Sequence, residues 1–153
     1  MNRRTLLKRT LAVSAVGVAA SAGLLTPGQV LAAYPKAAFE AKDTAGALSA
    51  AVGSGSYENS GDIKIKAPDI AENGSVVPVT VETGMSNVES ITLLADSNNA
   101  PMVASFMMHS SEPYVSTRIK MGKTGNVVAV VKSGGKLYAN QKEVKVTIGG
   151  CGG

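Results

Sequence analysis

The sequence predicts a mainly β protein, an antiparallel β-sandwich of about seven strands with a short N-terminal helix and a flexible, glycine-rich C-terminal arm. Three observations lead to it. Apolar and polar residues alternate in short segments after residue 62, turn-forming residues separate these segments at regular intervals, and the chain ends in Gly-Gly-Cys-Gly-Gly. Alternation with a period of two is typical of strands that bury one face. Several short strands with evenly spaced turns are typical of a sandwich.

Residues 1–32 are predicted to be an export signal. An uncharged stretch at 11–25 and small residues near Ala32 follow a basic start that consists of Arg3, Arg4, Lys8 and Arg9. This order of charged, apolar and small residues is that of a signal peptide, and the stretch is shorter than the roughly 20 residues of a spanning helix. The paired arginines before Leu-Leu-Lys indicate the twin-arginine route and a periplasmic destination. A membrane anchor is the alternative.

Residues 33–61 are predicted to form a helical segment and a linker. Asp43 or Thr44 can cap a short helix, and Gly53 can end it. A polar Gly-Ser-Gly-Ser link follows at 53–56. The apolar face of this helix would consist of Leu48, Ala51 and Val52.

Residues 62–148 are predicted to form the sandwich. Its expected strands lie at 63–66, 77–82, 91–94, 103–107, 115–121, 127–131 and 144–148. The turn signals between them lie at 72–74, 97–99, 122–125 and 133–135. The sequence Gly-Lys-Thr-Gly at 122–125 lacks the first glycine of a phosphate loop and precedes no helix pattern, so we expect a hairpin turn. Because the Cys-Trp-Cys set of antibody domains is missing, the immunoglobulin-like character is one of architecture only.

Charge and composition argue against several functions. The formal net charge of +4 is accounted for by the four basic residues of the export signal, which leaves 11 basic and 11 acidic residues. With only 4 Tyr, 2 Phe and no Trp, the chain has no basic stripe or stacking platform for nucleic acid. The carboxylates are scattered singly through turns, so no acid–base pair stands out.

The single histidine, His109, is expected in a loop or facing a partner. A blue-copper site needs two histidines with its cysteine, and a structural zinc site needs four Cys or His ligands. One His and one Cys cannot supply either. A Ser-His-Asp triad is equally hard to assemble around this residue. We therefore expect no metal, no other cofactor and no catalytic residue.

The conspicuous feature is the ending Gly149-Gly150-Cys151-Gly152-Gly153. Glycines have no side chain to pack and the widest backbone freedom, so this segment is not expected in the core. Five residues extend over about 17 Å, which lets the thiol swing clear of the domain. No Lys, Arg or His adjoins Cys151, so nothing in the local sequence activates the thiol. These properties suit a carrier that is activated inside other proteins; an intermolecular disulfide and an incidental cysteine stay open.

The last nine residues, Lys-Val-Thr-Ile-Gly-Gly-Cys-Gly-Gly, resemble the SoxY family, the sulfur-carrier subunits of the bacterial Sox thiosulfate-oxidation system. The likeness extends through residues 73–81, 116–122 and 134–138, and so covers essentially all of the mature chain. The resemblance implies a substrate carrier and not an enzyme. Cys151 would hold the pathway intermediates covalently, and the glycines of 149–153 would form a swinging arm.

The resemblance also implies partners. SoxZ would form a heterodimer with the chain, and the haem protein SoxAX would couple thiosulfate oxidatively to the thiol. The manganese hydrolase SoxB would then release sulfate and leave a persulfide, which the sulfur dehydrogenase SoxCD would oxidise in organisms that have it. The apolar stretch 102–108 is a candidate surface for SoxZ, but we expect Val103 and Phe106 in the core.

Two other classes of function are weighed against the carrier. A ubiquitin-like sulfur carrier converts a terminal Gly-Gly into a thiocarboxylate, but this chemistry spends ATP, which an exported protein lacks, and does not need Cys151. A structural or adhesive β-sandwich would use Cys151 for cross-linking and would form stable disulfide dimers without sulfur adducts. The atom that bears sulfur distinguishes the three functions.

Overall fold

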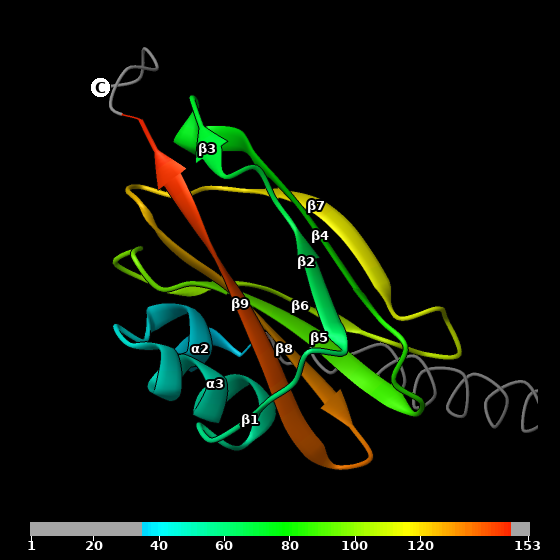
Figure 1. Ribbon diagram of the computed structural model, residues 1–153. Coiled ribbons are helices and arrows are strands. Elements are labelled where there is room, and N and C mark those ends of the chain that lie inside the picture. The colour runs from blue at the N-terminus through cyan, green and yellow to red at the C-terminus, as the bar shows by residue number, and fades with distance from the viewer. Residues whose placement is uncertain (1–34, 148–153) are drawn as a thin grey trace, which may run out of the picture. The chain divides into compact units, whose positions relative to one another are not determined.

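In the computed structural model of this protein, residues 35–147 are described. The predicted export signal at 1–32 and the predicted arm at 149–153 lie outside this range. The described chain begins with two helices and continues with strands (Figure 1). None of the described helices is long and apolar enough to span a membrane.

Two short helices, α2 (Lys36–Glu40) and α3 (Thr44–Val52), open the described chain. The Oδ1 atom of Asp43 accepts a hydrogen bond of 2.8 Å from the backbone N–H of Gly46 and so caps α3. Gly53 ends the helix with φ 85°, in the left-handed conformation common after helices. Asp43 as the N-terminal cap and Gly53 as the C-terminal end of this helix were both predicted from the sequence.

The strands form two sheets that face each other. The larger sheet has the order β1-β9-β8-β5-β6, with β3 also paired to β9; its strands are β1 (Glu58–Asn59), β3 (Ile70–Ala71), β5 (Val88–Ala95), β6 (Met102–Met107), β8 (Gly125–Ser133) and β9 (Lys136–Val146). The smaller sheet has the order β2-β4-β7, with β2 (Ile63–Lys66), β4 (Val77–Thr83) and β7 (Tyr114–Ile119). The 3-10 turn η2 (Gly74–Val76) leads into β4. This arrangement confirms the predicted mainly β sandwich.

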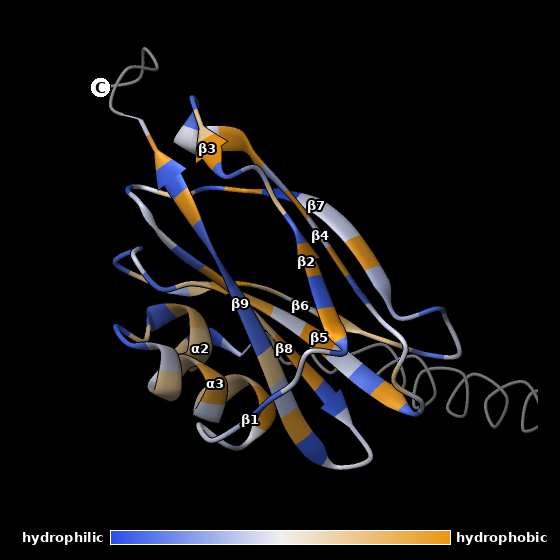
Figure 2. Cartoon of the chain, in the orientation of Figure 1, coloured by the Kyte–Doolittle hydropathy of each residue, from blue (hydrophilic) through white to orange (hydrophobic). Residues whose placement is uncertain are grey.

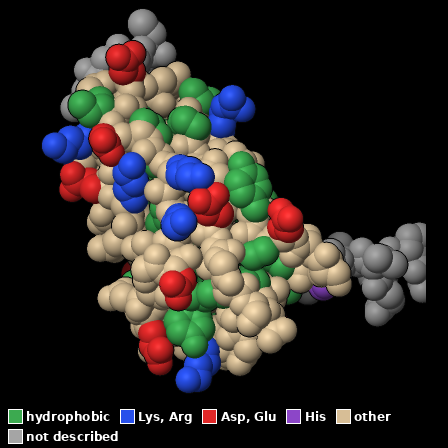
Figure 3. Space-filling model, turned by 45° about the vertical axis from the view of Figure 1, so that its right-hand side comes forward, with side chains coloured by type: hydrophobic (Ala, Val, Ile, Leu, Met, Phe, Trp, Pro, Cys, Tyr) green, Lys and Arg blue, Asp and Glu red, His purple; other side chains and the backbone are tan. Residues whose placement is uncertain are grey.

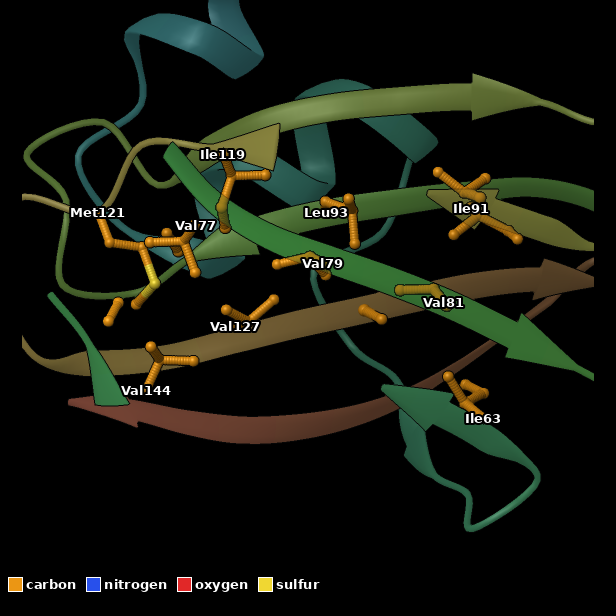
Figure 4. Packing of buried hydrophobic residues seen from close by; sticks show 14 of the residues in the cluster. Ile63, Val77, Val79, Val81, Ile91, Leu93, Ile119, Met121, Val127 and Val144 are labelled. Atoms are coloured by element: carbon orange, nitrogen blue, oxygen red, sulfur yellow. The ribbon is translucent and has the colours of Figure 1, made fainter. Parts of the chain in front are cut away.

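The central strands of the larger sheet, β5 and β8, are covered on both faces. One face meets the smaller sheet in the main core, whose members include Ile91 and Leu93 of β5, Val127 of β8 and Val77, Val79 and Val81 of β4 (Figure 4). The other face packs against the helices in a second core that includes Leu48, Leu94, Val128 and Val130. Strands covered on both faces are apolar throughout and do not alternate. This is why β5 and β8 appear in the sequence as apolar runs, and why both are strongly hydrophobic in Figure 2.

The predicted hairpin at 122–125 is wrong. The strand before it, β7, belongs to the smaller sheet, and the strand after it, β8, belongs to the larger one, so this turn carries the chain between the sheets. The turn at 133–135 does join the antiparallel neighbours β8 and β9. Its Gly134 and Gly135 have φ values of 55° and 78°, which glycine adopts without strain and which tight hairpins require.

Strand β9 goes beyond the predicted antiparallel pattern. It begins at Lys136 instead of near Val144, and it pairs in parallel with both β1 and β3. Its side chains also reach the smaller sheet: Asn140 Nδ2 donates to the Ile63 carbonyl oxygen, and Lys142 Nζ donates to the Ala67 carbonyl oxygen, each at 2.7 Å. These bonds tie β9 to β2 and to the residue that follows it, and they close one side of the sandwich.

We predict that Gly74→Ala destabilises the fold. An added Cβ would collide with the backbone carbonyl oxygen of Met121 and lie 2.8 Å from Cγ1 of Val146. Such overpacking typically costs about 1–3 kcal/mol in the free energy of unfolding, which urea denaturation measures. Gly61→Ala is the matched control, because nothing lies within 4 Å of its added Cβ. Equal stability of the two variants would contradict the prediction.

Candidate functional site

The predicted site residues Cys151, Gly149, Gly150, Gly152 and Gly153 lie outside the described residues. The structure describes the chain up to Thr147, directly after the end of β9. The candidate site is therefore built upward from the point where the predicted arm begins. We call residues 145–147, with the segments that hold them, the arm base.

Strand β3 holds the arm base on one side. It runs parallel to the end of β9, with Ile70 opposite Lys145 and Ala71 opposite Val146. The backbone N–H of Lys145 donates to the carbonyl oxygen of Asp69 at 2.9 Å, and that of Thr147 donates to the carbonyl oxygen of Ala71 at 3.1 Å. Hydrogen bonding therefore continues to the last described residue.

The turn between β7 and β8 holds the arm base on the other side. Strand β8 pairs with β9 only as far as Gly125 opposite Val144. Beyond that point a side chain replaces the strand as the hydrogen-bond partner of β9: Thr124 Oγ1 accepts a 2.9 Å hydrogen bond from the backbone N–H of Val146. The turn is itself tied to η2, since the N–H of Met121 donates to the carbonyl oxygen of Gly74 at 2.7 Å. The arm base is thus held from two directions.

A polar pocket lies beside the same turn, and sequence reasoning missed it. It has a volume of about 390 Å³ and is lined by Ser97, Asn98, Asn99, Lys120, Gly122 and Lys123. In the sequence, five of these residues fall in two separate turn signals, and Lys120 falls in the strand expected at 115–121. Nothing in their composition indicates that the turn after β5 lies against the turn after β7, so only the fold brings them together.

The other candidate residues lie elsewhere. His109 is exposed in the loop between β6 and β7. Val103 and Phe106 are half-buried against the main core, and the neighbouring Met107 is 63% exposed. Across residues 35–147 no three His, Cys, Asp or Glu side chains are grouped so that they could hold a metal ion.

We predict that Thr124→Val loosens the arm base without unfolding the domain. The substitution keeps the shape of the side chain but removes the acceptor of the Val146 N–H. Loss of one hydrogen bond of about 1 kcal/mol should speed amide exchange at Val146 by about fivefold. Hydrogen exchange followed by NMR measures this, with Thr117→Val on β7 as the control. Unchanged protection of Val146 in Thr124→Val would refute this role of the side chain.

Comparison with known proteins identifies a family that this chain resembles. The profile of "sulfur oxidation protein SoxY" matches residues 48–151, a range that includes Cys151. The solved structure of the sulfur carrier protein SoxY from Chlorobium limicola f thiosulfatophilum is 47% identical, with a TM-score of 0.63, over 73% of this chain and 97% of that one. A structure of the superantigen toxic shock syndrome toxin-1 is 10% identical with a TM-score of 0.41, over 56% of this chain and 99% of that one, and supports no inference. The search of curated proteins gave no match.

The family profile covers more than half of the chain, and the Chlorobium protein aligns over nearly all of its own length. The two findings agree with each other and with the resemblance carried by the Gly-Gly-Cys-Gly-Gly ending. This chain belongs to the SoxY family of sulfur oxidation proteins.

Proposed function

We propose that the protein is a periplasmic sulfur carrier of the Sox system, which holds pathway intermediates covalently on Cys151. The observation that carries the proposal is the position of the Gly-Gly-Cys-Gly-Gly sequence, which begins two residues after the anchored Thr147. Membership of the SoxY family supports the sulfur chemistry, because the related Chlorobium protein is described as a sulfur carrier. The role is that of a substrate and not of a catalyst.

The proposed chemistry needs a narrow tether on a firm support. Coupling of thiosulfate to the Cys151 thiol forms an S–S bond and releases a proton and two electrons, which a haem partner such as SoxAX accepts. Hydrolysis of the product by a partner such as SoxB adds water, releases sulfate and leaves a persulfide on Cys151. Each step takes place in a partner's active site, and SoxCD can oxidise the persulfide further. Glycines 149, 150, 152 and 153 keep the tether thin enough to enter.

The remaining parts of the proposal concern assembly and transport. Residues 1–32 serve as a twin-arginine signal that directs the chain to the periplasm, and the mature chain then consists of the helical segment 33–61, the sandwich 62–148 and the arm 149–153. SoxZ is the expected heterodimer partner. Export in a folded state suits a chain that must pair with a partner before it leaves the cytoplasm.

We predict that Cys151→Ser abolishes sulfur loading while the fold is kept. The protein would be isolated from the periplasm after growth on thiosulfate, and its intact mass measured with and without a thiol reductant. Reductant-labile sulfur adducts should be present in the wild type and absent in the variant, because serine forms no S–S bond. An unmodified wild-type mass, a disulfide dimer alone, or sulfur on the terminal carboxylate would each overturn the proposal.

A bulky arm residue should impair turnover more than folding. We predict that Gly150→Val lowers Sox-supported thiosulfate oxidation at least about tenfold, since a side chain on a tether that must thread an active site displaces the reacting sulfur. Reduction of an added haem electron acceptor by the reconstituted Sox proteins measures this, and urea denaturation measures stability. Gly61→Val in the open turn before β2 is the control. Comparable turnover by Gly150→Val and the wild type would show that arm width does not matter.

A further inference from the structure

The arm base is held differently from the rest of β9. The pairing of β9 with β8 ends where Val144 lies opposite Gly125, and Val144 is fully buried in the main core. The three residues beyond it pair instead with the two-residue strand β3 and, through one backbone N–H, with the side chain of Thr124. The fully buried part of β9 therefore ends one residue before the arm base.

Little apolar surface would be exposed if the arm base left this position. Lys145 and Thr147 are already exposed, and Val146 is half-buried against the main core. Release would therefore add one apolar side chain to the surface. On the face shown in Figure 3, apolar side chains are already scattered among basic and acidic ones. Single exposed apolar side chains are normal on a protein surface, so the sandwich can tolerate this one.

The segment that holds the arm base is itself fixed by other contacts. Lys142 Nζ lies 3.1 Å from Oδ1 of Asp69 and donates to the carbonyl oxygen of Ala67 at 2.7 Å. Ala71 is buried as a member of the main core. None of these contacts involves the arm base. The segment 67–71 can therefore keep its place when the arm base leaves it.

Release would lengthen the proposed arm considerably. The four residues 148–151 extend over about 14 Å, and the three residues of the arm base would add about 10 Å. The backbone freedom that these three residues regain offsets part of the loss of their hydrogen bonds. Short terminal segments with few buried contacts open locally far more often than the whole domain unfolds.

We propose that the arm base is a reserve of arm length, which leaves β3 and Thr124 while the arm occupies a deep active site. The proposal rests on the proposed carrier function. Between encounters the arm base is held and the reach of Cys151 is short. A partner enzyme that binds the sulfur group only at the greater depth shifts the equilibrium towards the released form. Strand β9 then ends at Val144, the sandwich stays closed, and the arm base returns to β3 afterwards.

Amide exchange tests the release in the isolated chain. The Cys151→Ser variant is used, since the chain has no other cysteine and the variant therefore offers no thiol to an added metal. The amides of Val146 and Thr147 should be protected less than about 100-fold, because they exchange through local release. The amide of Val144 should be protected at least about 1,000-fold, because it exchanges only when the domain unfolds.

A reversible lock on the arm base identifies the motion. Ile70 and Lys145 are register partners on β3 and β9, and both side chains are exposed. Ile70→His/Lys145→His places two imidazoles there that can share a zinc ion. Zinc at 100 times its dissociation constant should favour the held form by about 100-fold. Exchange at Val146 and Thr147 should slow by the same factor.

The same lock tests whether the reserve is used. In the locked variant with Cys151 intact, zinc should lower turnover by the reconstituted Sox proteins at least about tenfold, because the sulfur group stops short of the reacting position. Three glycines inserted before Gly149 should restore turnover, since they supply the missing length. Lys64→His/Glu82→His, a register pair of β2 and β4, is the control for effects of zinc on the enzymes. In this control pair zinc should change neither exchange nor turnover.

The outcomes separate the two proposals. If Val146 is protected as strongly as Val144, or zinc leaves exchange in the locked variant unchanged, the arm base does not open and the reserve is refuted. If zinc slows exchange but not turnover, or if the inserted glycines fail to restore turnover, the reserve is again refuted. In each of these cases sulfur on Cys151 after growth on thiosulfate would leave the carrier function standing. If Cys151 carries no sulfur, the carrier function fails and the reserve has no use.

Discussion

The structure depends on the hydrogen bonding of one strand, β9. This strand pairs with β8 along most of its length, adds β1 and β3 as parallel neighbours, and reaches the smaller sheet through Asn140 and Lys142. It therefore belongs to the larger sheet, closes one side of the sandwich and ends one residue before the last described residue, next to the proposed arm. Any change that shifts the register of β9 would alter the core and the arm base together.

Strand β9 connects two parts of the molecule with different roles, the sandwich and the proposed reacting group. The sandwich supplies a stable support with two apolar cores, one on each face of β5 and β8. The proposed reacting group is placed at the chain end, beyond the last described hydrogen bond at Thr147. An enzyme would bury its nucleophile among positioned acids and bases. A carrier instead presents an unactivated thiol and leaves the activation to the proteins that it visits.

Much of the fold could be predicted from local patterns, and the rest is a matter of topology. Alternation at Val77, Val79 and Val81 and the apolar run at 127–131 located strands correctly, and Asp43 and Gly53 marked the ends of α3. The turns at 122–125 and 133–135 look alike in sequence, but one changes sheets and the other is a hairpin. The same limit explains why Cys151 could be proposed as the carrier residue from the sequence, whereas the pocket of Lys120 and Lys123 could not be predicted. Cys151 lies in a contiguous sequence motif, whereas the pocket is formed by turns that are more than twenty residues apart in the chain.

The anchoring of Val146 and Thr147 on two sides also has a kinetic consequence. Because residues 145–147 are held, the proposed sulfur group on Cys151 would be confined to a sphere whose radius is about 14 Å, the extended length of four residues. Confinement by a short linker corresponds to an effective concentration of millimolar order or higher at any active site docked against the base. A partner enzyme would then need little affinity of its own for the sulfur group. Weak and brief encounters would suffice, which allows one carrier to serve several enzymes in turn.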